Sequence, residues 1–494
     1  MLAALKKGTP STEAFVEAYV SGGEPWMLLD RSARQLESRF ARLEIEGDAL
    51  ERTVLPARKA YAEAVHEMAS AYAAAFETCG GKTPPGVMRH ETVFREAVGP
   101  LLENADGSRK TAYFLVDALR YEMAAELAAG FDDGCEVSLR PVWGALPGIT
   151  EVGMAALVPG AEEGLTLVKK QKDFSVTVAG KALDTRAARM ERFRGCAGVP
   201  VVDMKLGDAA RLSPKRKKEV ENARLVVVTS QEIDRLGEDG ASEEETRAYM
   251  DDVLGKIHRA VRSLARCGVD RFVIAADHGF QLVATDESGL AVDAPGGETL
   301  SLHPRAWVGK GGGSGEAFLR LRARDIGLGG DLEFAFPRGL AVFRTRGGAG
   351  AYFHGGLSPQ EHILPLLSVA VSGKRADEAT TGMKVTLSTA RPSVTNRIFM
   401  VTVSGEPEGL FPAEERRVLL EITSGRKEAG LVVAAAYGFD DASRELTVEA
   451  GRPNSVTVML TAEGALDRLT VSATDPRSQV VLDVLKDLPV DLTL

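Results

Sequence analysis

The chain has 494 residues, of which 44% are hydrophobic and 26% are charged. This balance excludes a mainly disordered or fibrous protein, and the length exceeds what one hydrophobic core accommodates, so two or three domains are expected. The net charge of -10, without a dominant basic block, excludes nucleic-acid binding driven by overall charge, so any such contact must be local.

The cysteines and the apolar segments predict the cellular compartment of the protein. The four cysteines are scattered without a Cys-x-x-Cys pair, so the sequence predicts neither a disulfide framework nor a zinc ribbon. The first residues lack the apolar stretch of a signal peptide, and no run of about 18 apolar residues predicts a membrane span. We therefore expect a soluble, cytoplasmic protein with no membrane partner.

Residues 1–105 are expected to form a helical region. Apolar residues recur there at steps of three and four, the spacing that places them on one face of a helix. One stripe consists of Trp26, Leu29, Leu36 and Phe40, and a second of Tyr61, Val65, Met68, Tyr72 and Phe76. Each stripe needs a surface to pack against, so we expect this region to lie on the core. Glycines and prolines within 80–86 end the helical pattern.

Residues 106–375 alternate between short apolar runs and amphipathic helices. The runs are 113–116, 225–228 and 272–276. Strands covered by helices on both faces are apolar throughout, so this alternation predicts the α/β class, with a doubly wound, mostly parallel sheet. Asp117 and Asp277 directly follow the first and third runs, and Asp234 comes shortly after the second. Ligands bind at the carboxyl ends of such strands, so we expect these carboxylates to meet in one site.

Residues 380–494 have a different texture. Short apolar runs, separated by glycine, proline and aspartate turns, occupy 385–387, 398–403, 418–422, 431–435, 446–448, 456–460 and 469–472. This spacing predicts an antiparallel β-sandwich domain, with the immunoglobulin type as one candidate. A docking module and a structural cap are both compatible with it.

Two of the seven histidines stand beside sharp turns. His278 follows Asp277 and precedes a glycine, and His354 also precedes a glycine. Carboxylates, imidazoles and a hydroxyl are the groups that hold two divalent ions and supply a nucleophile for phosphoester hydrolysis. Taken singly, such residues commonly serve as turns or helix caps. The order Asp, Thr, Asp, Asp-His, His along the chain favours a shared metal site.

Five segments within residues 110–370 resemble, in order, the motifs of PglZ domains. They are 114–122 (FLVDALRYE), 146–154 (LPGITEVGM), 227–237 (VVTSQEIDRLG), 276–280 (ADHGF) and 353–358 (FHGGLS). PglZ domains belong to the alkaline phosphatase superfamily. The resemblance therefore implies the alkaline-phosphatase-like fold and metal-dependent hydrolysis of a phosphoester.

The resemblance also implies a role for each matching residue on the nucleophile side of the site. Asp117, Asp277 and His278 would bind one divalent ion, and Thr150 would be a ligand of the same ion and the nucleophile. Residues around Thr150 also allow another interpretation, in which its hydroxyl caps the following helix.

Asp234 and His354 would bind a second divalent ion. Superfamily members commonly have a histidine four residues after this aspartate, and here that position is Glu238. Zinc is the ion that the resemblance favours. A carboxylate ligand is harder than an imidazole, so Mn²⁺ or Mg²⁺ is a candidate for the second position.

Three further side chains near the motifs have an ambiguous role. Arg120, one helical turn after Asp117, is either a phosphoryl-binding residue or an ordinary exposed helix residue. His303 and His362 are additional imidazoles, and a structural role is favoured for both.

The resemblance implies a phosphodiesterase or nuclease of a BREX-type anti-phage defence system. DNA or a nucleotide would be the substrate, and other BREX-type proteins, such as BrxB, would be partners. A catalytically weak scaffold that binds defence partners or a phosphorylated ligand is the alternative, and Glu238 favours it. A simple phosphomonoesterase is a third hypothesis.

Overall fold

The computed structural model describes most of the chain. The described residues are 5, 8, 10–41, 48–103, 109–131, 135–238, 243–282, 291–345, 352–371, 383–407, 415–425, 427–441, 443–462, 466–476 and 481–492. They form two compact units, Met1–Ser372 and Gly373–Leu494. Within the described residues, no helix is both long enough and apolar enough to cross a membrane.

The helices α2 (Thr12–Val20), α3 (Met27–Ala41) and α4 (Asp48–Cys79) belong to the same compact unit as the large sheet. In α4 the expected apolar stripe is confirmed, because Val65, Met68, Tyr72 and Phe76 are all fully or almost fully buried. The Tyr72 and Phe76 rings lie 6.1 and 5.8 Å from the ring of Trp143, at the end of a strand of the large sheet. The helical region is thus fixed to that sheet by aromatic packing.

The stripe expected on α3 is wrong in its second half. Leu36 is 36% exposed, whereas Arg34 and Glu37 are buried. Glu37 forms an ion pair with Arg58 of α4, and Arg34 forms one with Glu122. Helical spacing predicts that α3 has a buried face, but these ion pairs determine which residues lie on that face.

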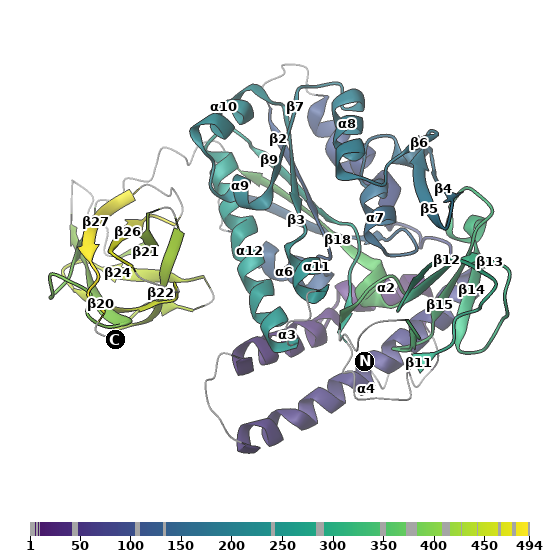
Figure 1. Ribbon diagram of the computed structural model, residues 1–494, viewed down its shortest axis with the longest axis horizontal. Helices are drawn as coiled ribbons and strands as arrows, with labels where there is room; N and C mark the ends of the chain where they lie inside the picture. The colour runs from purple at the N-terminus through teal and green to yellow at the C-terminus, as the bar shows by residue number, and fades with distance from the viewer. Residues whose placement is uncertain are drawn as a thin grey trace. The chain divides into compact units, whose positions relative to one another are not determined.

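A seven-stranded sheet forms the centre of the first unit (Figure 1). Its order is β1 (Met88–Arg89), β3 (Cys135–Trp143), β18 (Ile363–Val371), β9 (Arg271–Ala276), β2 (Thr111–Val116), β8 (Leu225–Ser230) and β7 (Val201–Lys205). Only β18 runs antiparallel to its neighbours. The three apolar runs of the sequence are the adjacent strands β9, β2 and β8, so the expected fold class is confirmed.

Helices lie on both sides of this sheet, with α6, α9 and α12 on one side in Figure 1 and α7 and α8 on the other. The longer ones are α6 (Tyr121–Ala129), α8 (Arg186–Cys196), α10 (Pro214–Asn222) and α12 (Glu243–Ala265). Shorter helices are η1 (His90–Thr92), η2 (Phe94–Val98), α5 (Gly99–Leu102), α7 (Thr150–Ala156), η3 (Ala161–Glu163), α9 (Leu206–Ala210), α11 (Glu232–Glu238), η4 (Ala323–Ile326) and α13 (Pro359–His362).

Smaller sheets are inserted between the sheet strands, and the sequence patterns did not reveal them. The strands are β4 (Leu165–Lys170), β5 (Asp173–Val178), β6 (Lys181–Ala182), β10 (Gln281–Leu282), β11 (Ala291–Val292), β12 (Glu298–His303), β13 (Ala306–Lys310), β14 (Phe318–Arg322), β15 (Glu333–Pro337), β16 (Val342–Phe343) and β17 (Tyr352–Phe353). The antiparallel pair β10 and β17 brings residues 281–282 beside 352–353. It thereby joins two of the motif segments.

The second unit is an antiparallel sandwich that approaches a closed barrel. Its strands are β19 (Met383–Ser388), β20 (Ile398–Pro407), β21 (Glu415–Ser424), β22 (Lys427–Ala435), β23 (Phe439–Asp440), β24 (Glu445–Glu449), β25 (Asn454–Leu460), β26 (Arg468–Thr474) and β27 (Val481–Pro489). All strand pairs are antiparallel, and the core is mostly valine and leucine. The expected β-sandwich is confirmed, and its seven anticipated strands are joined by β23 and β27.

Candidate metal centre

Asp117 and Asp277 stand at the same edge of the large sheet. They follow β2 and β9, which are parallel and have their last residues, Val116 and Ala276, in register. Oδ1 of Asp277 accepts hydrogen bonds from the backbone N–H groups of Ala118 (3.0 Å) and His278 (2.9 Å). The carboxylate of Asp277 therefore ties the turn after one strand to the turn after its neighbour.

Thr150 is the first residue of α7 and does not cap it. The N-cap is Ile149, which makes no capping bond through its side chain. The Thr150 hydroxyl Oγ1 instead lies 3.2 Å from Nε2 of His278. Gly153 lets α7 approach this closely: a Cβ there would strike the carbonyl oxygen of Asp277 and stand 2.6 Å from its carbonyl carbon.

Asp234 and His354 form the other side of the site. Asp234 lies on α11, which follows β8, and His354 follows β17. His354 Nε2 is 3.8 Å from Oδ1 of Asp234. The hydroxyl of Tyr352 donates to the same oxygen (3.0 Å), a contact that the sequence gave no reason to expect. Glu238 is the last residue of α11, and its side chain lies outside the described residues.

The two imidazoles share one orientation. The rings of His278 and His354 stack at 4.2 Å with an interplanar angle of 4°. Nδ1 of His278 donates to the carbonyl oxygen of Gly279 (3.0 Å), and Nδ1 of His354 donates to that of Gly148 (3.1 Å). These bonds leave each Nε2 facing the carboxylates, as in histidines that bind metal ions.

The candidate side chains form two overlapping groups of potential ligands. Asp117, Asp277 and His278 form one, and Asp234, His278 and His354 form the other. Within each group the ligand atoms lie within 4.8 Å of one another. Six of the seven residues named from the sequence are therefore together, and only the side chain of Glu238 is not placed.

The electrostatics of the site are dominated by its carboxylates. Burial raises the pKa of Asp277 well above its usual value, and the carboxylate of Asp117 raises it further. Burial lowers the pKa of His278, but Asp277 and Asp117 outweigh this effect and raise it to about 10. Burial, followed by the charge of His278, lowers the pKa of His354 well below its usual value. The site thus strongly favours positive charge beside the carboxylates.

The donor set fits divalent cations. Both carboxylate oxygens of Asp117 and Oδ2 of Asp277 are buried and accept no well-aligned hydrogen bond within the described part of the chain; Nε2 of His278 lies 3.3 Å from Oδ1 of Asp117 and 3.6 Å from Oδ2 of Asp277. Such atoms are normally satisfied in a folded protein. Carboxylate oxygens and imidazole nitrogens are ligands of Zn²⁺ and Mn²⁺, and Mg²⁺ accepts the oxygens.

Comparison with known proteins identifies the family of this chain. The family model described as the BREX system PglZ alkaline phosphatase-like domain matches residues 93–369, more than half of the chain. The chain belongs to the PglZ family. The resemblance based on the five motifs is therefore confirmed.

Two curated relatives are similar to part of this chain. The alkaline phosphatase-like protein BrxZ of Escherichia coli O9:H4 (strain HS) is 26% identical over 306 residues, which are 60% of this chain and 34% of BrxZ. The alkaline phosphatase-like protein PglZ of Bacillus cereus (strain H3081.97) is 23% identical over 323 residues, which are 63% of this chain and 36% of that protein. The chain thus spans about a third of the length of these relatives.

Solved structures of low identity also match part of the chain. Murine ectonucleotide pyrophosphatase/phosphodiesterase 5 is 11% identical with a TM-score of 0.38, covering 53% of this chain and 88% of that one. Phosphonoacetate hydrolase from Sinorhizobium meliloti 1021, in complex with phosphonoformate, is 12% identical with a TM-score of 0.34, covering 53% and 90%.

The structure corrects both interpretations of Arg120 in this PglZ domain. Arg120 is neither exposed nor directed to a phosphoryl group: it is 3% exposed, and its guanidinium pairs with Asp30 of α3 at 2.9 Å. His362 has the structural role that was favoured, with one ring nitrogen bonded to Tyr72 and the other to the carbonyl oxygen of Gly144, both at 2.8 Å.

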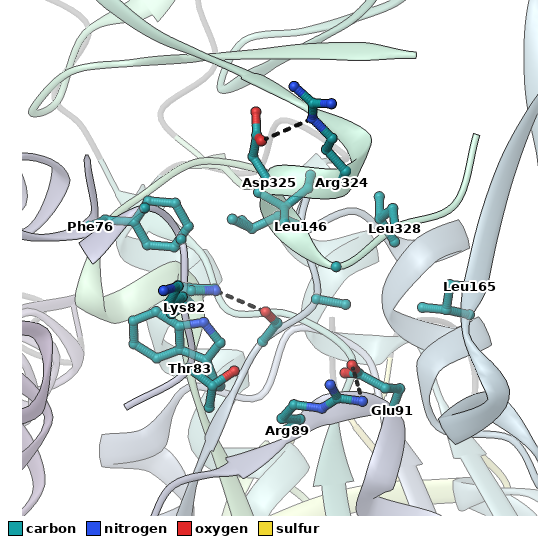
Figure 2. A pocket seen from close by; sticks show the side chains of 18 residues that line it. Phe76, Lys82, Thr83, Arg89, Glu91, Leu146, Leu165, Arg324, Asp325 and Leu328 are labelled. Atoms are coloured by element: carbon teal, nitrogen blue, oxygen red, sulfur yellow. Dashed lines mark hydrogen bonds and ion pairs between the residues drawn. The ribbon is translucent and has the colours of Figure 1, made fainter. Parts of the chain in front are cut away.

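A cavity of about 540 Å³ lies where β1 and β3 end. Its ionic lining residues are Lys82, Arg89, Glu91, Arg324 and Asp325. Figure 2 shows the pair Arg324 and Asp325 across the cavity from the pair Arg89 and Glu91. Leu146 also lines it, four residues before Thr150 in the same motif. The described residues that line it include neither Thr150 nor any of the candidate ligands.

Proposed function

We propose that the chain is a metal-dependent phosphoester hydrolase that cleaves phosphodiesters, with Thr150 as the nucleophile. The observation that carries the proposal is the position of the Thr150 hydroxyl, 3.2 Å from the one imidazole, His278, that both ligand groups share. A capping threonine would place its hydroxyl on its own helix instead.

The residues of the first group, Asp117, Asp277 and His278, would hold one divalent ion. Asp234 and His354 would hold a second, with Glu238 as a candidate third ligand. Bound divalent ions supply charge neutralisation of phosphoryl oxygens and acidify a coordinated hydroxyl. Zinc suits the imidazole-containing groups, and Mn²⁺ or Mg²⁺ suits a second position that contains an additional carboxylate.

The chain's own residues orient these groups before a substrate binds. The Nδ1 bonds to Gly148 and Gly279 fix the two rings, and the Tyr352 hydroxyl fixes one oxygen of Asp234. The close contact of Gly153 with Asp277 fixes α7, and thereby the Thr150 hydroxyl. Such preorganisation limits the rearrangement needed in the transition state.

We further propose that the cavity receives the remainder of a diester substrate, although its described lining residues include Leu146 of the Thr150 motif and none of the candidate ligands. A diester carries a second organic group beside the reacting phosphorus, and a volume of about 540 Å³ is within the range of small-molecule sites. The cations Lys82 and Arg324 suit a substrate with further phosphates, such as DNA or a nucleotide. Family membership supports a role in a BREX-type defence system, with other BREX proteins such as BrxB as partners.

The proposal is tested by assaying one purified sample against a chromogenic diester, a chromogenic monoester and plasmid DNA. We expect diester cleavage that chelation abolishes and Zn²⁺ or Mn²⁺ restores. Preference for the monoester would favour a phosphomonoesterase. Inactivity on all three substrates, despite bound metal, would favour the scaffold hypothesis, which the Glu238 position supports.

The cavity is tested separately with the double variant Lys82→Glu, Arg324→Glu. We expect the KM for plasmid DNA to rise about tenfold or more, because two phosphate contacts are reversed in charge, while cleavage of the small chromogenic diester changes little. The double variant Lys384→Glu, Lys486→Glu, on β19 and β27 of the other unit, makes the same change in net charge and is the control. An equal effect of the control variant would contradict the role of the cavity.

Metal content distinguishes the two groups of ligands. Asp277→Ala should release more metal than Asp234→Ala, since the nucleophile-side group has a complete set of ligands and the second has Glu238 in place of a histidine. Elemental analysis of the purified variants measures this difference. Equal losses would contradict the asymmetry.

A further inference from the structure

Three of the motif segments that carry a candidate ligand contain, or are closely followed by, a buried polar residue. Arg120 comes three residues after Asp117, and Gln281 comes three residues after His278. Gln360 comes six residues after His354. The exposed fraction of all three side chains is 3% or less. Buried polar side chains are costly unless they are bonded, so their partners are informative.

Two of these side chains converge on Asp30, which α3 contributes from the amino-terminal helices. Asp30 is 1% exposed, and its Oδ1 lies 2.9 Å from Nη2 of Arg120. Nε2 of Gln360 lies 3.1 Å from both oxygens of the Asp30 carboxylate. The hydroxyls of Tyr19 and Tyr61 also donate to it, each at 2.8 Å. One carboxylate thus links the turn after β2 to the loop that follows His354.

The third side chain joins through Gln360. Nε2 of Gln281 donates to Oε1 of Gln360 (2.9 Å) and to the Ser358 hydroxyl (2.8 Å). The backbone N–H of Gly279 donates to the carbonyl oxygen of Glu361 (3.1 Å). These bonds hold the segment with Asp277 and His278 against the segment that follows His354.

The same loop is fixed from its other side by a buried ion pair. Glu361 accepts from Nε (3.2 Å) and Nη2 (2.8 Å) of Arg305, and both side chains are almost fully buried. Its Oε1 also accepts from the backbone N–H of Gly356 (2.8 Å). The loop after His354 is therefore held rigidly. The amino-terminal helices contribute Asp30 of α3 and also Tyr72 of α4, whose hydroxyl bonds to Nδ1 of His362 (2.8 Å).

We propose that Asp30 is a positioning residue of the metal centre, through which the amino-terminal helices align the ligand-bearing loops. Asp30 lies outside residues 93–369, which the family model matches, so the helices would complete a site that the matched region alone leaves without this anchor. The inference rests on the metal centre proposed above. The proposed role requires the carboxylate of Asp30, because an apolar side chain would fill the same space without orienting Arg120 or Gln360.

The test compares Asp30→Asn with Glu37→Gln in the full chain. Glu37 is the matched control: it is a buried carboxylate of the same helix, and it pairs with Arg58 of α4 at 2.7 Å. Two quantities are measured, the Kd for Zn²⁺ by competition with a chromogenic chelator, and hydrogen–deuterium exchange of the metal-free protein over residues 276–282 and 352–362. Melting temperatures are recorded in parallel.

We expect Asp30→Asn to raise the Kd for Zn²⁺ about tenfold, the lower end of the effect of losing a group bonded directly to a ligand, because Asp30 acts on the ligand-bearing segments through Arg120 and Gln360. It should also accelerate exchange in both segments. Glu37→Gln should leave the Kd and the exchange of these segments unchanged even if its melting temperature falls. Equal effects of the two variants, or an unchanged Kd and exchange in Asp30→Asn, would overturn the proposal.

Two further measurements distinguish failure of this proposal from failure of the proposed function and from misfolding of the variant. If wild-type protein binds no Zn²⁺, the proposed function fails, whereas faster exchange in Asp30→Asn alone still supports the positioning role. If Asp30→Asn does not fold, Tyr61→Phe removes one hydrogen bond from the same carboxylate. Faster exchange in residues 352–362 of that variant supports the proposal, and unchanged exchange overturns it.

Discussion

Replacing Thr150 by alanine separates a nucleophile from a structural hydroxyl. The hydroxyl lies 3.2 Å from Nε2 of His278, and Ile149 occupies the capping position of α7. Thr150→Ala should therefore cost no more than one hydrogen bond, about 0.5 to 1.5 kcal/mol of unfolding free energy. Loss of a nucleophile should instead reduce the rate of diester cleavage about a thousandfold or more, which corresponds to about 4 kcal/mol in the activation barrier.

The assay measures metal-dependent diester cleavage, metal content and melting temperature on the same preparations. Thr150→Ser is the control, because it keeps a hydroxyl on Cβ and should retain much of the activity. The expected order is wild type, then serine, then alanine far below, with metal content nearly constant. An alanine variant that cleaves at close to the wild-type rate would refute the reasoning and favour attack by water.

Two further predictions concern the framework of the site. Gly153→Ala should lower the unfolding free energy by about 1 to 3 kcal/mol and weaken metal binding, because the added Cβ would strike the backbone of Asp277. Gly195→Ala is the control, since the space around its Cβ is open. Equal melting temperatures of the two variants would count against the argument. Burial lowers the pKa of His90 from 6.5 to about 4 and that of His362 from 6.5 to about 3. Because the unfolded chain then binds more protons, the contribution of these two histidines should be complete above pH 6.5 and decline as the pH falls towards 4, by up to about 1.4 kcal/mol per unit for each. Asp277 and His278 titrate in the opposite sense, so urea unfolding between about pH 7.5 and 5 is compared for wild type and His362→Gln, in which those two groups are retained. Parallel profiles of the two proteins would disprove the contribution of His362.

Local sequence pattern was sufficient to predict the strand ends that carry the acids. Continuous apolar runs identify strands buried on both faces, and three of them are β2, β8 and β9. Asp117 and Asp277 were therefore expected at one edge, and the structure places their turns in contact through the bond from Ala118 to Asp277. This prediction succeeded because a strand that is buried on both faces consists almost entirely of apolar residues.

The same local signal was weaker where a partner distant in the sequence decides the outcome. The antiparallel strand β18 and the insertion of β12 to β15 were not predicted, since a strand pattern does not specify its neighbour or its direction. Leu36 was assigned to a buried stripe that ion pairs of Arg34 and Glu37 occupy instead. The hydrophobic pattern alone cannot identify a charged side chain that is buried in an ion pair.

The sequence by itself determined which residue types are available for a metal centre and which strands deliver two of its carboxylates. Only the tertiary structure decided that His354, 76 positions after His278, stacks its ring on that residue at 4.2 Å. It also decided that Arg120 faces Asp30 rather than solvent. The physical reason is that helix and strand patterns record whether a side chain is buried, whereas its bonding partner depends on how elements far apart in the chain pack against one another.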